Sequence, residues 1–390
     1  MTSESQQLSG QYVETVAFGE TVRAFVPNAL PPQIDLAAPK TLKRLNEANR
    51  ALGRLDGIKD LLPNPDLFLY FYVRKEALLS SQIEGTQSSF SDLLLFEADE
   101  TPRVSADDVG EVTNYVAAMN LGLERLDRLP ISTRLLKELH AVLMQGVRGE
   151  NKSPGEFRRS QNWIGGTRPG NAHYVPPPPN QVVELMSDLE KFIHSDELAE
   201  APLVKAALAH VQFETIHPFL DGNGRLGRLL IALMLVESGA LSSPLLYLSL
   251  YLKARRDQYY TLLSKMRFES AWEEWLAFFL DGVVEISEQA YRTAQNLLAQ
   301  FAEDEQLIRT LGRPADSALR VHAELKRRPI ANVRLLSDWS GLTPPTVRSS
   351  LGRLIDLKVV LQPGEAKRDK IYSYEAVLRI LEQGTDPIRK

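Results

Sequence analysis

The residues most able to do chemistry in this chain lie together at positions 217 to 228. They read His-Pro-Phe-Leu-Asp-Gly-Asn-Gly-Arg-Leu-Gly-Arg. The imidazole of His217 ordinarily titrates near neutral pH, so it could serve as a general base. The carboxylate of Asp221 supplies the hard oxygen ligands that Mg²⁺ prefers. A base and a metal-binding carboxylate are thus placed within five residues of each other.

The other residues of this stretch are suited to binding anions. Gly222 and Gly224 flank Asn223, and glycines let the main chain approach an anion closely. Arg225 and Arg228 are three residues apart, so on a helix both can flank one site. The guanidinium fork matches phosphate oxygens. The stretch therefore predicts a pocket for a polyphosphate, a divalent metal and a proton acceptor.

The flanking segments predict how this stretch is held. Apolar residues recur with helical spacing at 202–214 and again at 226–236. Pro218 biases His217 away from helical geometry. We expect a tight loop that opens into a helix N-terminus, where free N–H groups and the helix dipole favour bound anions.

The rest of the chain predicts a mainly α-helical protein. Two short strands, at 13–18 and 22–26, should form a hairpin. A second hairpin is expected at 162–175, where two β-favouring pieces flank a Gly/Pro turn, and four prolines at 176–179 impose an extended exit. The expected helices of the body cover about 40–61, 66–84, 88–97, 106–126, 132–144, 180–193, 203–214, 224–238, 249–265, 272–299 and 302–310.

Composition bounds the class of protein. The chain has 390 residues, enough for two or three domains, with 44% hydrophobic and 24% charged residues. It has no cysteine, which excludes disulfides, thiolate catalysis and Cys-based zinc sites. The longest apolar run, 229–236, is too short to cross a membrane, and the polar N-terminus has no signal-peptide core. We therefore expect a cytoplasmic protein with no membrane partner.

The C-terminal part has the pattern of a separate module. After Gly312-Arg313-Pro314, three helices and two strands are expected, at about 316–327, 332–340, 344–357, 359–361 and 370–374. Three helices and a two-stranded wing make a winged helix-turn-helix. From 316 onward there are 14 Lys and Arg against 9 Asp and Glu, whereas the whole chain has a net charge of −5.

A basic module of this kind could bind DNA or protein. Its third helix carries Arg348 and Arg353 but no Asn or Gln to read a base edge, and two prolines stand at its start. We therefore favour protein docking or dimerisation, and DNA binding remains an open alternative.

The stretch 217–228 resembles the signature of the Fic family, His-x-Phe-x-(Asp/Glu)-Gly-Asn-Gly-Arg-x-x-Arg, at every specified position. The resemblance implies a helical fold that transfers AMP from ATP to a protein hydroxyl. It further implies that His217 deprotonates the target hydroxyl and that Asp221 binds a Mg²⁺ bridging the phosphates. The amide loop 222–224, with its Asn, would hold phosphates, and Arg228 would grip the terminal phosphate.

The residue at position 224 distinguishes a resemblance to Fic proteins from a resemblance to the related Doc-like kinases. Doc-like kinases are similar to Fic proteins, but they carry Lys where Gly224 stands here and transfer the γ-phosphate. Gly224 therefore favours transfer of AMP. Such a transfer needs a base for the attacking hydroxyl and neutralisation of charge at the α-phosphorus as pyrophosphate leaves.

A second motif indicates a brake in the same chain. Residues 80–85 read Ser-Ser-Gln-Ile-Glu-Gly at the end of the expected helix 66–84. They are similar to the Fic inhibitory motif, with Ser80 and Glu84 in the matching places. The resemblance implies that Glu84 pairs with Arg228 and occupies the place of the γ-phosphate. ATP would then bind with its α-phosphate turned away from attack, so Glu84→Gly should raise adenylylation.

The hairpin 162–175 stands where the family places its flap. By the resemblance, the flap pairs with the backbone of the target protein as an added strand. Ile164 and Tyr174 are the residues of the flap that we expect to act.

An aromatic pair follows the signature. Tyr259 and Tyr260 match residues that line the adenine pocket in the family, although ordinary core packing explains them equally well. Seven residues later the family often carries an Asn, whereas this chain has Arg267, so that contact is not carried over.

These interpretations divide the chain into an N-terminal extension (1–60), a helical Fic core that includes the inhibitory helix (61–311) and a winged-helix domain (316–378). The expected function is an autoinhibited adenylyltransferase that uses ATP and Mg²⁺. It would modify a Tyr, Thr or Ser hydroxyl of a target protein, which could be the chain itself.

Two other functions remain open. One is a phosphodiesterase that removes AMP, with Glu84 positioning a water. The other is a DNA-binding regulator whose core only senses a nucleotide. Transfer of another group, such as uridylyl, and assembly into a homodimer also remain open.

Overall fold

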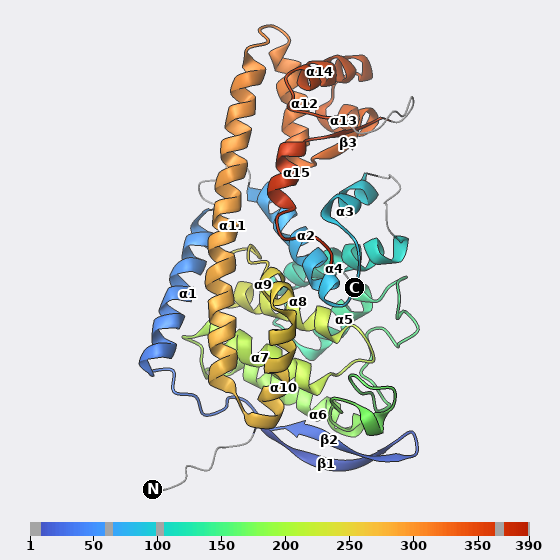
Figure 1. The fold of residues 1–390 in the computed structure, drawn as a ribbon, viewed down its shortest axis with the longest axis vertical. Coiled ribbons are helices and arrows are strands. Elements are labelled where there is room, and N and C mark those ends of the chain that lie inside the picture. Colours follow the sequence, from blue (N-terminus) through green and yellow to red (C-terminus); the bar gives the residue numbers. More distant parts are fainter. Residues whose placement is uncertain (1–8, 59–64, 99–104, 363–369, 389–390) are drawn as a thin grey trace.

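The computed structural model describes residues 9–58, 65–98, 105–362 and 370–388, and these are mainly helical. Figure 1 shows a large helical body and a smaller C-terminal unit, joined by the long helix α11 (Trp272–Arg309). The other helices of the body are α1 (Pro39–Gly57), α2 (Pro65–Ile83), α3 (Phe90–Glu97), α4 (Ala106–Leu126), α5 (Thr133–Leu143), α6 (Val182–His194), α7 (Pro202–Ile216), α8 (Asn223–Glu237), α9 (Ser249–Ala254) and α10 (Arg256–Glu269).

Helices α7 and α8 form the centre of the body. Every residue of α7 from Leu203 to Ile216 is buried, and so is the run from Arg225 to Leu235 of α8. In α8 the run 229–235 is apolar on all sides, as expected of a core helix, whereas α7 is buried together with polar residues such as His210 and Glu214. The two helices pack against each other, so the loop between them is held at both ends by buried elements. Among the described residues, none of the helices has an apolar stretch long enough to cross a membrane.

The N-terminal hairpin is present, with strands β1 (Gly10–Ala17) and β2 (Glu20–Pro27) in antiparallel register. Its two-residue turn is Phe18-Gly19, and both residues have positive φ, 52° and 82°. Such turns match the twist of the flanking strands. The N–H of Phe25 also donates to the carbonyl of Val175 at 2.9 Å, so the hairpin supports the segment that follows the expected flap.

Two helix boundaries in the body differ from the prediction. The helix expected at 249–265 is divided at Arg255 into α9 and α10, where contacts of this side chain with Tyr251 and Glu285 accompany the break. The helices expected at 272–299 and 302–310 are one continuous helix, α11, because buried Phe301 continues its packed face. The expected end of the first helix, near 61, lies outside the described residues.

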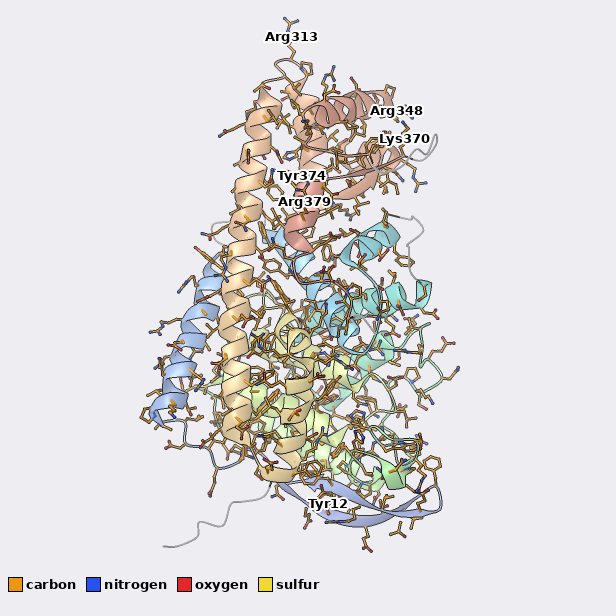
Figure 2. The ribbon with its side chains drawn as sticks, viewed as in Figure 1. Tyr12, Arg313, Arg348, Lys370, Tyr374 and Arg379 are labelled. Atoms are coloured by element: carbon orange, nitrogen blue, oxygen red, sulfur yellow. The ribbon has the colours of Figure 1, made fainter. Side chains whose placement is uncertain are left out.

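The C-terminal unit contains the three expected helices, α12 (Ala315–Arg327), α13 (Val333–Ser340) and α14 (Pro344–Asp356). The expected strand at 359–361 was wrong except for one bridge from Leu361 to Ser373. The strand that pairs with β4 (Ile371–Ser373) is β3 (Ile330–Asn332), which the sequence did not reveal. A final helix, α15 (Glu375–Leu381), leads back to the body. Figure 2 shows Arg313, Arg348 and Lys370 on the outside of this unit.

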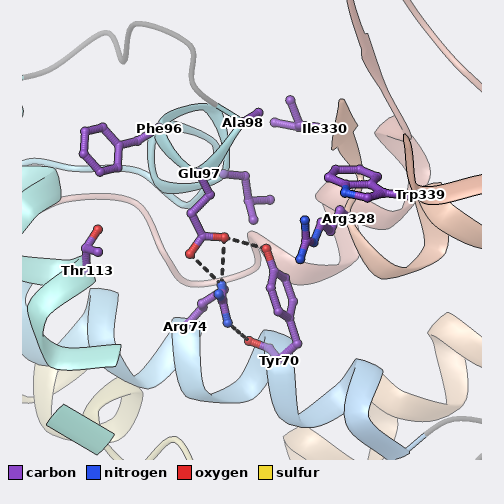
Figure 3. A pocket seen from close by; sticks show the side chains of 10 residues that line it. Tyr70, Arg74, Phe96, Glu97, Ala98, Thr113, Arg328, Ile330 and Trp339 are labelled. Atoms are coloured by element: carbon purple, nitrogen blue, oxygen red, sulfur yellow. Dashed lines mark hydrogen bonds and ion pairs between the residues drawn. The ribbon is translucent and has the colours of Figure 1, made fainter. Parts of the chain in front are cut away.

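The unit meets the body at a cavity of about 400 Å³. There the guanidinium of Arg74 lies 3.4 Å from the ring centre of Tyr70 and 2.9 Å from a carboxylate oxygen of Glu97. On the opposite wall Arg328 lies over the ring of Trp339 (Figure 3). The residues of the signature do not line this cavity, so it belongs to the junction between the two parts.

Candidate active site

The loop between α7 and α8 carries the candidate base, as expected. His217 ends α7 in the left-handed conformation, with φ of 50°, and Gly222, with φ of 76°, precedes the first residue of α8. The side chain of Asn223 closes the loop, because its amide accepts from the N–H of Phe219 and donates to the carbonyl of Phe219, both at 2.9 Å.

This contact corrects one expectation. The side chain of Asn223 is buried and committed to Phe219, so it is not available to a phosphate. The first N–H groups of α8, which begins at Asn223, have no partner within the helix. The main chain of 222–224, rather than the amide side chain, is therefore the part of this loop that can hold an anion.

His217 lies in a setting that keeps its ring neutral. Burial, together with the positive charges of Arg158 and Arg267, lowers the pKa of His217 to about 3, although the carboxylate of Glu84 acts in the opposite direction. At pH 7 the imidazole is thus the free base, the form that can accept a proton. Its Nδ1 is buried and has no hydrogen-bond partner among the described residues. This nitrogen is therefore not committed to another side chain or to the main chain of the described residues.

Arg158 is a residue of the site that the sequence analysis missed. Its Nε donates to the carbonyl of His217 at 2.9 Å, and its Nη2 donates to the carbonyls of Pro177 at 2.6 Å and Ile216 at 3.3 Å. Its backbone N–H donates to the carbonyl of Pro218 at 2.9 Å. One buried residue therefore ties the loop of the base to the segment that leaves the flap. Nothing in its local sequence separates it from the other arginines of the chain.

Glu84 and Arg228 meet as expected. Arg228 Nη2 lies 2.6 Å from Glu84 Oε1, and the same guanidinium donates to the hydroxyl and to the carbonyl of Ser80, both at 2.9 Å. Burial alone would raise the pKa of Glu84, but the charge and hydrogen bond of Arg228 outweigh it and hold that pKa below its usual range. The glutamate is thus an anion bound in the site.

The position of this carboxylate is marked by Gly224. A Cβ placed on Gly224 would lie 2.2 Å from Glu84 Oε1 and 3.0 Å from Arg228 Nη1. The carboxylate therefore lies directly over the first turn of α8, where an anion is favoured by the helix dipole. Any side chain at 224 would collide with it.

Arg225 does not face the same place as Arg228. Its Nη1 lies 3.1 Å from Glu111 Oε2, its Nη2 contacts Met144, and both members of the ion pair with Glu111 are buried. The expectation that both arginines flank one anion is therefore corrected. The first turn of α8 directs Arg225 toward α4 and Arg228 toward α2.

Asp221 fits the role of a metal ligand supplied by one protein carboxylate. Its side chain is 43% exposed, and one of its oxygens accepts the N–H of Gly222 at 2.6 Å. No group of three or more acidic or histidine side chains that could hold a metal exists among the described residues. Mg²⁺ is commonly held by one or two carboxylates together with substrate phosphates and waters, so a single exposed carboxylate fits Mg²⁺ bound with a nucleotide.

The two expected tyrosines have different surroundings. Tyr259 is buried, and its hydroxyl lies 2.9 Å from Nε2 of His210. This is the core packing that the sequence analysis kept as an alternative. Tyr260 is 36% exposed, with the guanidinium of Arg256 5.0 Å from its ring centre. Of the two tyrosines, only Tyr260 therefore has surface left for a ligand.

The expected flap is formed by a single bridge rather than by two strands. Ile164 and Tyr174 are the bridged residues, with Ile164 N–H donating to Tyr174 carbonyl at 2.8 Å. Ile164 is 36% exposed. The ring of Tyr174 is buried, its hydroxyl donates to the carbonyl of Thr215 at 2.5 Å, and Arg267 stacks on it at 3.7 Å. Tyr174 thus anchors the flap, and Ile164 is the residue left at the surface.

Comparison with known protein families identifies both halves of the body. Residues 42–124 match the Fic/DOC family N-terminal model, and residues 130–235 match the Fic/DOC family model. The second match contains the signature loop and most of α8, and the first contains α2 with Glu84.

Curated relatives carry similar segments. The chain is 34% identical over 137 residues to a protein from Drosophila erecta named protein adenylyltransferase Fic, covering 35% of this chain and 26% of the relative. It is 32% identical over 179 residues to the Drosophila grimshawi protein of the same name, covering 45% and 34%. The chain therefore spans about a quarter to a third of the length of these relatives.

Solved structures share the fold. A crystal structure of a Fic family protein from Desulfovibrio desulfuricans G20 matches with a TM-score of 0.58 and 22% identity, covering 88% of this chain and 98% of that one. A Fic domain containing signaling protein from Bacteroides thetaiotaomicron matches with a TM-score of 0.50 and 18% identity, covering 64% and 97%. The chain therefore matches both Fic/DOC family models, the N-terminal model over residues 42–124 and the other over residues 130–235, and it shares its fold with these structures.

Proposed function

We propose that this chain is a protein adenylyltransferase and that its own Glu84 restrains it. The observation that carries the proposal is the carboxylate of Glu84, bound to Arg228 at 2.6 Å over the first turn of α8. This place suits a phosphate, and it lies in the same loop–helix element as the neutral imidazole of His217. The names of the curated relatives support the same activity.

The reaction forms one bond and breaks one bond. The hydroxyl oxygen of the target attacks the α-phosphorus of ATP, and a new O–P bond forms. The bond from the α-phosphorus to the oxygen that bridges it to the β-phosphorus breaks, and pyrophosphate leaves with the electron pair. His217 accepts the proton of the hydroxyl, which its free-base form permits.

The chain's other residues bind and orient the triphosphate. The main-chain N–H groups at the start of α8 and the guanidinium of Arg228 are suited to its oxygens. Asp221 is the residue that would hold Mg²⁺, which when bound supplies positive charge to the phosphate oxygens. Tyr260 offers its exposed surface to the base of the nucleotide.

The restraint follows from competition between two anions. Glu84 and a terminal phosphate both require Arg228 and the same space above Gly224. While Glu84 holds that space, the triphosphate cannot extend into it, and its α-phosphorus is not presented to the base. Displacement of the carboxylate would leave the guanidinium free for the nucleotide.

Transfer of label from ATP carrying a radioactive α-phosphate tests the proposal. The Glu84→Gly variant should label a protein in a lysate or itself, the wild-type chain should label weakly, and Glu84→Gly with His217→Ala should not label. Mass spectrometry of the labelled protein identifies the group and the acceptor side chain. Label that persists without His217 would exclude this residue as the base, and UTP tested in parallel would reveal a preference for uridylyl.

Removal of AMP is a second candidate. The ionised carboxylate of Glu84 is 32% exposed, so it could also orient a water for attack on an AMP ester. In that case an AMP-modified protein should release AMP with the wild-type chain and not with Glu84→Gly, which is the opposite of the order expected for transfer.

A further inference from the structure

The face of α2 that points away from Arg228 is occupied by the C-terminal end of the chain. After α15, residues 382–388 return to the body and run beside α2 (Figure 1). Buried Lys75 donates from Nζ to the carbonyl of Gln383 at 2.9 Å. Buried Gln82 donates from Nε2 to the carbonyl of Thr385 at 2.8 Å. Two side chains of α2, seven residues apart, thus recognise main-chain carbonyls of the tail.

Helix α9 and the start of α3 complete the binding surface. Lys253 of α9 donates to the carbonyls of Gly384, at 3.4 Å, and Asp386. Ser91 of α3 donates to the carboxylate of Glu382. A Cβ on Gly384 would lie 2.8 Å from a methyl carbon of Leu250, so the tail approaches α9 as closely as a glycine allows. These contacts from α2, α3 and α9 define a groove for the tail. In it residues 382–385 form a turn, closed by the N–H of Thr385 donating to the carbonyl of Glu382 at 2.9 Å.

The groove and the brake share the last turn of α2. Ser80, which binds Arg228, and Gln82, which binds the tail, are two residues apart, so they project about 200° apart around the helix. Gln82 also donates to the carbonyl of Ser88, beyond Glu84. The same glutamine therefore links the tail to the backbone on the far side of the glutamate.

We propose that residues 382–388 occupy this groove as a latch that holds the last turn of α2 and thereby keeps Glu84 on Arg228. The latch rests on the proposed function, because it regulates the same site. It places the C-terminal unit in control of the brake: a partner that binds this unit and draws α15 away would remove four carbonyl contacts from the groove. The freed end of α2 could then move Glu84 out of the anion site.

A matched pair of truncations tests this proposal. A chain that ends at Leu381 loses the latch, whereas a chain that ends at Ile388 keeps every contact described above. Hydrogen exchange of the segment 80–85 should be roughly tenfold faster in the first than in the second, because the turn opens more often. Transfer of AMP should rise roughly five- to tenfold in the first chain. A synthetic peptide of residues 382–390 should reverse both effects.

Repeating the truncation in the Glu84→Gly variant distinguishes the latch from other causes of activation. In the Glu84→Gly background, removal of 382–390 should not raise transfer further. An equal rise in both backgrounds, or equal exchange in the two truncated chains, would overturn the latch. If no variant transfers AMP, the exchange measurement still decides whether the tail holds α2, so failure of the proposed function is distinguishable. Lys253→Met, a partly exposed change, serves if the truncated chain does not fold, and it should accelerate exchange in the same segment.

Discussion

Two arginines of α8, three residues apart, hold two glutamates in different ways. Arg225 and Glu111 are each only 2% exposed, and Glu111 is in the middle of α4, fixed on both sides by helix. Arg228 is equally buried, but its partner Glu84 is 32% exposed and lies just beyond the end of α2, before Gly85 with φ of 105°.

The two glutamates also differ in the direction in which their surroundings shift the carboxyl pKa. Burial raises the pKa of Glu111 despite Arg225, whereas the pull of Arg228 lowers the pKa of Glu84 despite burial. A carboxylate on a helix end with access to solvent can leave its partner and be hydrated. A carboxylate inside a helix cannot leave its partner in this way. The Arg225–Glu111 pair is therefore suited to hold the scaffold, and the Arg228–Glu84 pair is suited to exchange its carboxylate for a phosphate.

The largest effect is expected at the scaffold pair. Glu111→Ala leaves the guanidinium of Arg225 buried without its carboxylate, which should lower the free energy of unfolding by about 3–5 kcal/mol. Urea unfolding at pH 7 measures this loss. A loss no larger than that of Glu84→Ala would remove the distinction between the two pairs.

The exchangeable pair should affect activity instead. Glu84→Gly frees Arg228 for the nucleotide and should raise transfer of AMP by roughly a hundredfold. The rate of label transfer at saturating ATP is the measurement. Glu111→Gln is the matched control and should not activate the chain. Activation by both changes would mean that loosening α8, rather than freeing Arg228, releases the brake.

A smaller effect is expected from Arg158, which acts through His217. Because burial and nearby arginines lower the pKa of His217 to about 3, transfer by the Glu84→Gly chain should be independent of pH from 8 down to about 5. Arg158→Gln removes one of these charges, so the pKa rises and activity should begin to fall at a higher pH. Arg158→Lys keeps the charge and should preserve the profile. If the Glu84→Gly chain showed the same pH dependence of AMP transfer with and without Arg158→Gln, Arg158 would have no such effect on His217.

The smallest expected effect is on Tm. The Tm difference between wild type and variant should change with pH in opposite directions for the two pairs. The pKa of Glu84 is lowered in the folded chain, so its contribution to stability is present above its ordinary value of 4.5 and is lost as the pH falls through the folded value. The difference in Tm between wild type and Glu84→Gln should therefore shrink on acidification. The pKa of Glu111 is raised, so the difference for Glu111→Gln should shrink as the pH rises. If the Tm differences for Glu84→Gln and Glu111→Gln changed in the same direction with pH, the proposed difference between the two ion pairs would be contradicted.

The helices of the body were predictable where their apolar spacing was long and regular. Residues 106–126 form the expected helix without correction. The errors fall where a contact distant in sequence decides the boundary, as when Arg255 turns toward Glu285 and divides α9 from α10. Strand β3 was missed because three residues carry no alternation, and only its partner β4 makes it a strand.

The sequence analysis named most of the residues that the structure brings together at this loop, but it missed Arg158 and did not give their orientation. Three residues of separation placed Arg225 and Arg228 on one face in the sequence argument, yet their long side chains diverge to acids on different helices. The amide of Asn223 turns inward because the buried backbone of Phe219 needs its two hydrogen bonds. That the C-terminal unit is a winged helix that binds protein or DNA, and that the chain is cytoplasmic, stay predictions.

The sequence by itself determined that the base lies on a loop, because Pro218 disfavours continuation of the helix through His217 and Gly222 permits the positive φ that precedes α8. It also determined the burial of α8, because the run 229–235 is apolar on every side. Only the tertiary structure decided that Arg158 clamps the loop, that Glu84 lies over Gly224 and that the C-terminal tail binds α2. Each of these joins residues far apart in the chain by hydrogen bonds or charge, and such contacts exist only once packing has brought the partners together.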